Sequence, residues 1–212
     1  QAYQKGVRHF DTAPGYGMAE QILLEWIEEF QPNDVKISTK WGYTYVADFD
    51  PYAIVHEVKE HSLSKLNQQW ETSKKFLPYL NIYQIHSATL DSGVLENEAV
   101  LNRLYELKNT YKINIGLSTS GEYQNEIIEK ALSIQVNNQP LFDSFQVTYN
   151  IFNQHLLKIM KLLRELDKKL IVKEALANGR VFPNNKFPNY NNIYLVLDAL
   201  ATKYKVGIDA IA

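Results

Sequence analysis

LNIYQIHSATLDSGVLENEAVLNRLYELKNTYKINIGL, residues 80 to 117, is the most informative segment of this 212-residue chain. Its two ends, 80–85 and 113–117, are apolar runs rich in β-branched and aromatic residues, which is typical of buried strands. Between them, apolar side chains in 96–111 recur three and four positions apart, as in an amphipathic helix. A strand, a helix and a strand in this order predict two parallel strands joined by a helical crossover.

The same alternation continues in both directions along the chain. Further strands are expected at 7–11, 35–39, 144–148 and 170–172, and further helices at 19–30, 51–77, 123–133, 154–167 and 193–204. This pattern predicts a parallel (β/α)8 TIM barrel of which about six strand–helix units are present. The alternative, an open doubly wound sheet, normally has a glycine-rich turn after its first strand, and no such turn follows 7–11.

The ends of the sequence suggest a piece of a longer protein. The opening QAYQKG resembles the last turn of a helix closed by a glycine, and the final residues enter another helix. We therefore expect residues 1–212 to be a single barrel domain that is truncated at both ends. The first strand and the last strand–helix unit of the barrel would be missing.

Composition excludes several classes of function. The chain has 22 Lys and Arg against 24 Asp and Glu, a net charge of −2, so it offers no electrostatic footprint for nucleic acid or an anionic membrane. It has no cysteine, which excludes disulfides, thiolate metal sites and cysteine nucleophiles. No apolar run approaches the ~20 residues of a membrane span. We expect a soluble, cytoplasmic protein that acts on a small molecule, and nothing indicates its oligomeric state.

Each expected strand ends on polar side chains. In chain order these are Asp11, Lys40, His86, Ser118, Gln146, and then Lys173 with Glu174. The carboxyl ends of barrel strands converge on one face, which is where barrel enzymes place their active sites. The sequence therefore predicts one shared site built from these residues.

Two local motifs give weaker evidence of a functional site than the strand ends do. His56-Glu57 with His61 resembles a zinc-protease motif, but the second histidine comes one residue too late for H-E-x-x-H. We expect both imidazoles to be solvated on the helix 51–77, and we predict no metal site. The segment GLSTSG (116–121) has no lysine for a phosphate-binding loop, although its backbone N–H groups and hydroxyls could serve a ligand.

Five segments together resemble the aldo-keto reductases. They are HFDTAPGYG (9–17), ISTKWG (37–42), YQIHS (83–87), GLSTSG (116–121) and FQVTYN (145–150), in the family's order and at compatible spacing. The resemblance runs along the whole chain. It implies an eight-stranded α/β barrel that binds a nicotinamide dinucleotide, usually NADPH, without a Rossmann fold.

The resemblance also implies roles for individual residues. The family's catalytic tetrad falls on Asp11, Tyr16, Lys40 and His86. Its nicotinamide carboxamide contacts fall on Ser118, Thr119 and Gln146, with Thr119 where many members have asparagine. Leu176 and Asn178 match positions that line the pyrophosphate. The segment that grips the 2′-phosphate lies beyond Ala212, so the resemblance favours NADPH and leaves NADH as the alternative.

The run VKEAL (172–176) departs from the family. The family commonly has A-Y-S-P-L here, with the aromatic residue stacked on the nicotinamide. Lys173 takes the place of that aromatic residue, and Glu174 the place of the small polar one. Lys173 is therefore expected at the cofactor with an altered stacking mode.

The tetrad suits carbonyl reduction, which needs a hydride donor and a proton donor. A tyrosine hydroxyl has a pKa near 10, and we expect the ammonium of Lys40 to lower the pKa of Tyr16. Asp11 would hold Lys40 charged and in place. His86 would polarise the carbonyl. The proton donor is predicted to be Tyr16, with Trp41 and Tyr43 as an apolar wall for the substrate.

Three other functions remain open from the residues. Lys40 or Lys173 could form a Schiff base, as in a lyase. The chain could be a non-catalytic dinucleotide-binding redox sensor or partner subunit. Asp11, His86 and Glu174 are possible ligands of a metal hydrolase. The main prediction is an NAD(P)H-dependent oxidoreductase that reduces an aldehyde or ketone to an alcohol.

Overall fold

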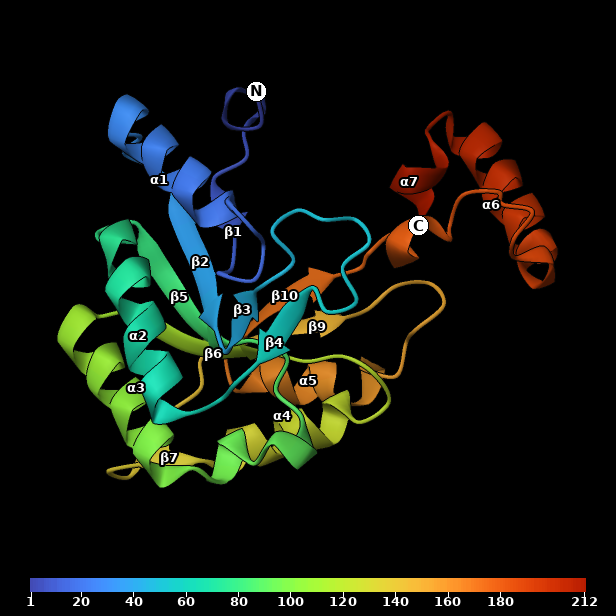
Figure 1. Cartoon of the computed structure of the whole chain (residues 1–212). Helices are drawn as coiled ribbons and strands as arrows, with labels where there is room; N and C mark the ends of the chain where they lie inside the picture. Colours follow the sequence, from blue (N-terminus) through green and yellow to red (C-terminus); the bar gives the residue numbers. More distant parts are fainter.

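A six-stranded parallel sheet forms the centre of the computed structural model, which describes residues 1–212 (Figure 1). Its strand order is β1-β2-β5-β6-β9-β10, and every neighbouring pair is parallel. The strands are β1 His9–Asp11, β2 Lys36–Trp41, β5 Leu80–Ile85, β6 Asn114–Ser118, β9 Ser144–Thr148 and β10 Lys169–Lys173. The sheet curls as part of a (β/α)8 barrel, which confirms the predicted fold class.

Helices alternate with these strands along the chain. They are α1 Ala19–Phe30, α2 Leu63–Ser73, α3 Glu98–Tyr111, α4 Gln124–Ser133, α5 Leu157–Glu165, α6 Asn191–Tyr204 and α7 Ile208–Ile211. Short 3₁₀ turns occupy Tyr3–Lys5, Lys74–Phe76, Leu90–Ser92, Val94–Glu96, Ala177–Gly179 and Pro188–Tyr190. The first of these turns ends at Gly6, whose φ of 95° closes it as predicted for QAYQKG.

The face of the sheet that meets the helices is apolar. Its buried side chains are Ile37, Trp41, Tyr83, Ile85, Ile115, Leu117, Phe145 and Val147. They pack against helix residues such as Leu66, Trp70, Leu104, Ile128 and Ile159. Burying one such side chain contributes about 1.5–3 kcal/mol, so this layer is the main stabilising contact of the sheet.

The opposite face of the sheet is polar, because the register aligns polar side chains across neighbouring strands. Asp11 pairs with Ser38, Lys40 with Gln84, Ser118 with Gln146, and Thr148 with Lys173. Paired residues project to the same face of a sheet, and every second residue of a strand shares that face. This register gathers residues from distant parts of the chain on one concave surface.

The segment 51–77 was predicted as one helix, and this prediction is wrong. Only its second half is helical, as α2, and its first half is a mostly exposed loop containing β4 (Glu57–Lys59). This strand pairs antiparallel with β3 (Tyr43–Tyr45), and the hairpin lies near the carboxyl ends of the main strands (Figure 1).

Local chemistry explains this difference. Residues 54–59, IVHEVK, include three β-branched side chains, which favour a strand over a helix. Ser62 then starts α2 as an N-cap, because its Oγ accepts a hydrogen bond from the Lys65 backbone N–H at 3.1 Å.

The other predicted elements agree with the structure to within a few residues. The bounds of α1, β5 and β9 match to the residue. A second short hairpin, β7 Gln135–Val136 with β8 Gln139–Pro140, was not predicted. Figure 1 shows α6 and α7 standing away from the sheet. None of the helices combines the length and apolar character that a bilayer crossing requires.

Candidate functional site

An ion pair between Lys40 and Asp11 lies at the centre of the concave polar face. The Lys40 side chain is 0% exposed, and its Nζ donates hydrogen bonds to the Asp11 carboxylate and, at 3.0 Å, to the carbonyl oxygen of Thr12. A buried ammonium is tolerated only when it is paired in this way. Burial lowers the pKa of Lys40, and the charge of Asp11 opposes that effect.

Two further residues hold the Asp11 carboxylate, and the sequence analysis did not identify them. Ser38 Oγ donates to Asp11 at 2.5 Å, and Gln84 Nε2 donates at 3.2 Å. Each lies two positions before a predicted site residue, Lys40 or His86. Because residues two apart share a strand face, this spacing is the signal that could have found them.

Tyr16 lies in the loop between β1 and α1 and faces both Lys40 and His86. Its ring centroid is 5.7 Å from that of His86, edge to face, and Lys40 Nζ is 4.9 Å from the Tyr16 ring centroid. The side chain is 46% exposed, so the ring borders open space. The structure therefore brings together all four residues expected to form the tetrad.

The expectation that Lys40 lowers the pKa of Tyr16 is wrong for this structure. Burial raises the pKa of Tyr16 to about 12, and the negative charges of Asp11 and Glu57 raise it further. The Lys40 ammonium is bonded to the Asp11 carboxylate, so it does little to lower the pKa of the Tyr16 phenol. The Tyr16 hydroxyl is thus held in its protonated form.

His86 directly follows β5 and is a neutral imidazole. Burial lowers the pKa of His86 to about 3, and the nearby charge of Lys40 adds to this effect. Its Nδ1 is buried without a hydrogen-bond partner, which leaves Nε2 as the accessible ring nitrogen. A neutral imidazole carrying its proton on Nε2 is a hydrogen-bond donor toward the open side of the site.

The β3–β4 hairpin packs on His86, with two departures from the sequence analysis. The Tyr43 ring centroid lies 4.6 Å from that of His86, so Tyr43 borders the site. Trp41 does not, because it projects from the opposite face of β2 into the apolar core. His61, expected to be solvated, is partly buried: its Nε2 lies 2.9 Å from the His86 carbonyl oxygen, and burial lowers the pKa of His61 to about 4.

The side chains expected to contact a nicotinamide differ in whether they are already hydrogen-bonded within the protein. Ser118 Oγ accepts a hydrogen bond from the Ser87 N–H at 2.9 Å, and Thr119 Oγ1 donates to the Ala88 carbonyl at 3.2 Å. Gln146 lies beside Ser118 in register, is 5% exposed, and makes no side-chain hydrogen bond within the protein. Its carboxamide is the free donor and acceptor pair of this face.

Lys173 and Glu174 form a network at the end of β10. Lys173 Nζ lies 3.1 Å from Glu174 Oε1, which also accepts from Thr148 Oγ1 at 3.2 Å. Asn178 Nδ2 lies 3.4 Å from Glu174 Oε2. Leu176 is partly buried between these two residues in the loop, and no recorded hydrogen bond or ion pair joins this network to the Lys40–Asp11 pair.

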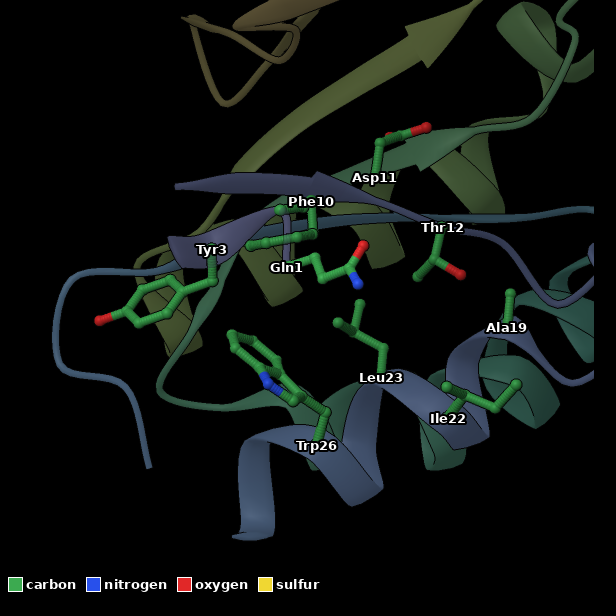
Figure 2. A pocket seen from close by; sticks show the side chains of 10 residues that line it. Gln1, Tyr3, Phe10, Asp11, Thr12, Ala19, Ile22, Leu23 and Trp26 are labelled. Atoms are coloured by element: carbon green, nitrogen blue, oxygen red, sulfur yellow. The ribbon is translucent and has the colours of Figure 1, made fainter. Parts of the chain in front are cut away.

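An apolar cavity of about 510 Å³ lies on the other side of β1, between that strand and α1. Figure 2 shows Phe10, Leu23 and Trp26 around it, with Asp11 at one end. Its lining contains neither Lys40 nor His86. Asp11 thus borders both the cavity and the polar face, and its carboxylate points away from the cavity (Figure 2).

No three His, Cys, Asp or Glu side chains of the chain gather closely enough to hold a metal ion. Asp11, His86 and Glu174, the possible ligands named above, therefore do not form a joint donor set. The arrangement offers instead a protonated phenol, a neutral imidazole and a buried ion pair around one space.

Comparison with known proteins points in one direction. The model of the Aldo/keto reductase family matches residues 1–212. No curated protein matches the chain. A putative aldo-keto reductase structure from Pseudomonas aeruginosa is 27% identical with a TM-score of 0.65, over 85% of this chain and 65% of that one.

Two structures with lower sequence identity also share the fold. The glycerol dehydrogenase of Gluconobacter oxydans has a TM-score of 0.73 at 22% identity, over 99% of this chain and 68% of that one. An aldo-keto reductase from Bacillus halodurans, in its holo form, has a TM-score of 0.67 at 19% identity, over 86% and 57%. The chain thus spans about two thirds or less of the length of several structures that it matches.

Proposed function

Because the chain belongs to the aldo/keto reductase family, we propose that it reduces an aldehyde or ketone to the alcohol with a nicotinamide dinucleotide. The observation that carries this proposal is the grouping of Tyr16, His86 and the Lys40–Asp11 pair at one end of a parallel sheet. In such a sheet, ligand sites lie at the carboxyl ends of the strands.

The polar face suits the cofactor. A nicotinamide bears a carboxamide, and the free carboxamide of Gln146 can both donate to it and accept from it. When bound, NADPH, or NADH as the alternative, supplies the hydride for the carbonyl carbon. The residues proposed to hold the cofactor are Ser118, Thr119, Gln146, Lys173, Leu176 and Asn178.

Each tetrad member has a separate task in this proposal. Tyr16 gives its phenolic proton to the carbonyl oxygen as negative charge develops there. The Nε2–H of His86 donates a hydrogen bond to the same oxygen and stabilises that charge. Lys40 Nζ lies 4.9 Å from the Tyr16 ring centroid, so the Lys40–Asp11 pair packs against the ring and positions it beside His86. Asp11 keeps Lys40 charged and in position.

Replacing Tyr16 with phenylalanine tests this assignment. We expect Tyr16→Phe to lower kcat for aldehyde reduction by roughly 100-fold or more, since a positioned proton donor contributes about 10²–10⁴. Affinity for NADPH, followed by energy transfer from tryptophan to the cofactor, should stay near the wild-type value. Tyr52→Phe is the matched control, because Tyr52 is exposed. Equal turnover in Tyr16→Phe and Tyr52→Phe would contradict the proton-donor role.

Assays of cofactor dependence and of borohydride trapping on the same protein distinguish this function from the Schiff-base alternative. Lys40 Nζ is fully buried and bonded to Asp11, so a lyase would have to use the more accessible Lys173. Reduction that requires NADPH or NADH supports the proposed function. Covalent trapping of substrate on Lys173 by borohydride, without any need for a dinucleotide, would replace it. Tight binding of NADPH without turnover of any carbonyl compound would favour the redox-sensor alternative.

A further inference from the structure

Glu57 places a carboxylate beside the residues of the proposed reaction. A methyl group built on Gly15 would lie 3.0 Å from Glu57 Oε2, 3.3 Å from Tyr43 Cβ and 3.9 Å from His86 Cε1. The three side chains therefore surround one point on the backbone directly before Tyr16. Glu57 reaches this point from β4, on the hairpin that stands outside the main sheet.

The carboxylate of Glu57 has no partner in the protein. The structure records no ion pair and no side-chain hydrogen bond for it. Lys59, the nearest cation on the same strand, donates instead to the Ser87 carbonyl at 2.8 Å and to Thr89 Oγ1 at 3.3 Å. Glu57 is also exposed, so its oxygens are open to a ligand.

Most of the other charges around the site are paired. Lys40 is neutralised by Asp11, and Lys173 by Glu174. His86 is neutral, since burial holds its pKa near 3. The charge of Glu57 is felt at the site, because it raises the pKa of both Tyr16 and Tyr43. Lys59 also has no ion pair, and its Nζ lies 6.0 Å from the Tyr43 ring centroid, but it donates to neutral oxygens of Ser87 and Thr89. Glu57 is the unpaired carboxylate whose charge reaches both Tyr16 and Tyr43.

We propose that Glu57 determines substrate specificity, favouring carbonyl compounds that carry an ammonium group and disfavouring those that carry a carboxylate. A carboxylate only accepts hydrogen bonds, so it binds ammonium and N–H donors and repels other anions. The inference rests on the proposed carbonyl reduction. It adds the charge of the preferred substrate, which the tetrad itself does not specify.

Three benzaldehydes that differ in the charge of the para substituent test the inference. They are benzaldehyde, 4-carboxybenzaldehyde and 4-(trimethylammonio)benzaldehyde, with NADPH as the reductant. The measured quantity is the ratio of kcat/KM for the cationic aldehyde to that for the anionic one. Glu57→Gln removes the charge and keeps the shape, and we expect it to lower this ratio roughly fivefold, mainly through KM, as for an exposed charge interaction.

Two further variants sharpen the test. Glu57→Lys should lower the ratio further and reverse the preference, and 0.5 M salt should weaken every difference by screening. Asp48→Asn, which removes an exposed charge from the loop that joins β3 to β4, is the control and should keep the wild-type ratio. A ratio that is the same in the wild type, Glu57→Gln and Glu57→Lys would overturn the inference.

The same assay gives a different result if the proposed carbonyl reduction itself is wrong. If none of the three aldehydes is reduced with NADPH or NADH, carbonyl reduction of this class is rejected, whatever Glu57 does. Equilibrium binding of the three compounds, followed by tryptophan fluorescence, then decides the inference. A cationic preference that Glu57→Gln removes supports a charge-selective site, and equal binding of all three compounds by both proteins overturns it.

Discussion

Tyr16 of the candidate site is held in its protonated form, although a lysine lies beside it. A lysine close to a tyrosine ordinarily favours the phenolate. Here the Lys40 ammonium is bonded to Asp11, and burial together with two carboxylates raises the pKa of Tyr16. In the proposed reaction, this phenol therefore stays protonated until the substrate oxygen develops negative charge.

A pH profile tests this protonation state. With Tyr16 near pKa 12 and His86 near pKa 3, neither group changes charge between about pH 5 and pH 10. We therefore expect kcat/KM for reduction of a neutral aldehyde to be level across this range, at constant ionic strength. A loss of activity with a midpoint near pH 8–9 would contradict the level profile and show that Tyr16 or Lys40 changes charge in the working complex.

The sequence predicts which residues form the candidate site better than it predicts whether those residues are charged. Lys40 and His86 are recognisable because lysine and histidine are unusual at the end of an apolar strand, whereas an aspartate such as Asp11 is common there. The depressed pKa of His86 is not recognisable, because the burial that causes it comes from the β3–β4 hairpin, more than 25 residues away in the chain. A pattern of residues does not contain that contact.

Among the elements, the β3–β4 hairpin depends on one glycine. Gly42 has a φ of 108°, and a Cβ at this position would lie 2.4 Å from His61 Cδ2. This conformation suits glycine alone, and the close approach lets His61 pack beneath the hairpin and bond to the His86 carbonyl.

Gly42→Ala is therefore expected to displace the hairpin. The strained φ and the steric overlap together should lower the free energy of unfolding by about 2–4 kcal/mol and reduce turnover. Urea unfolding and aldehyde reduction measure the two effects. Gly93→Ala is the matched control, since Gly93 also has a positive φ, of 62°, but has open space around it. Similar losses in both variants would show that steric contact with His61 is unimportant.

The helix expected over 51–77 shows where prediction of elements fails. Charged and apolar residues alternate there in a manner compatible with a helix, and a two-stranded hairpin outside the main sheet leaves only three-residue strands. Such a short pairing gives no long periodic signal. The strand β5, by contrast, is predicted to the residue, because four of its six residues are buried apolar side chains, namely Leu80, Ile82, Tyr83 and Ile85.

For the whole molecule, stability should fall in mild acid. His61 and His86 have folded pKa values of about 4 and about 3, below the 6.5 of an unfolded histidine. Between these values the unfolded chain binds more protons, so stability is full above pH 6.5 and falls as the pH drops toward 4. Each histidine then costs about 1.4 kcal/mol per pH unit.

Urea unfolding at pH 7, 6 and 5 measures this slope. His61→Gln should reduce it by roughly half, because one of the two buried imidazoles is gone. His56→Gln is the control, since His56 lies exposed in the same segment. A slope that His61→Gln leaves unchanged would assign the acid sensitivity to other groups.

The overall arrangement is the most predictable level of this protein. A strand and a helix repeated six times permit few topologies, and the parallel order places residues as distant as Asp11 and Gln146 on one face. The residues Ser38 and Gln84 follow from the same rule once the register is known. The register itself comes from packing of the apolar face, which the sequence pattern constrains but does not fix.

The hairpin that carries Glu57 has a consequence for how such a protein can diversify. The polar face is tied to the register of six strands, and a change of one residue there would turn its side chains into the core. The loop that leads to β4 is mostly exposed, and Ile54 within it is 100% exposed. The hairpin lies outside the main sheet. If Glu57 has the proposed role, selection can therefore alter substrate preference there without changing the strands that carry Asp11 and Lys40.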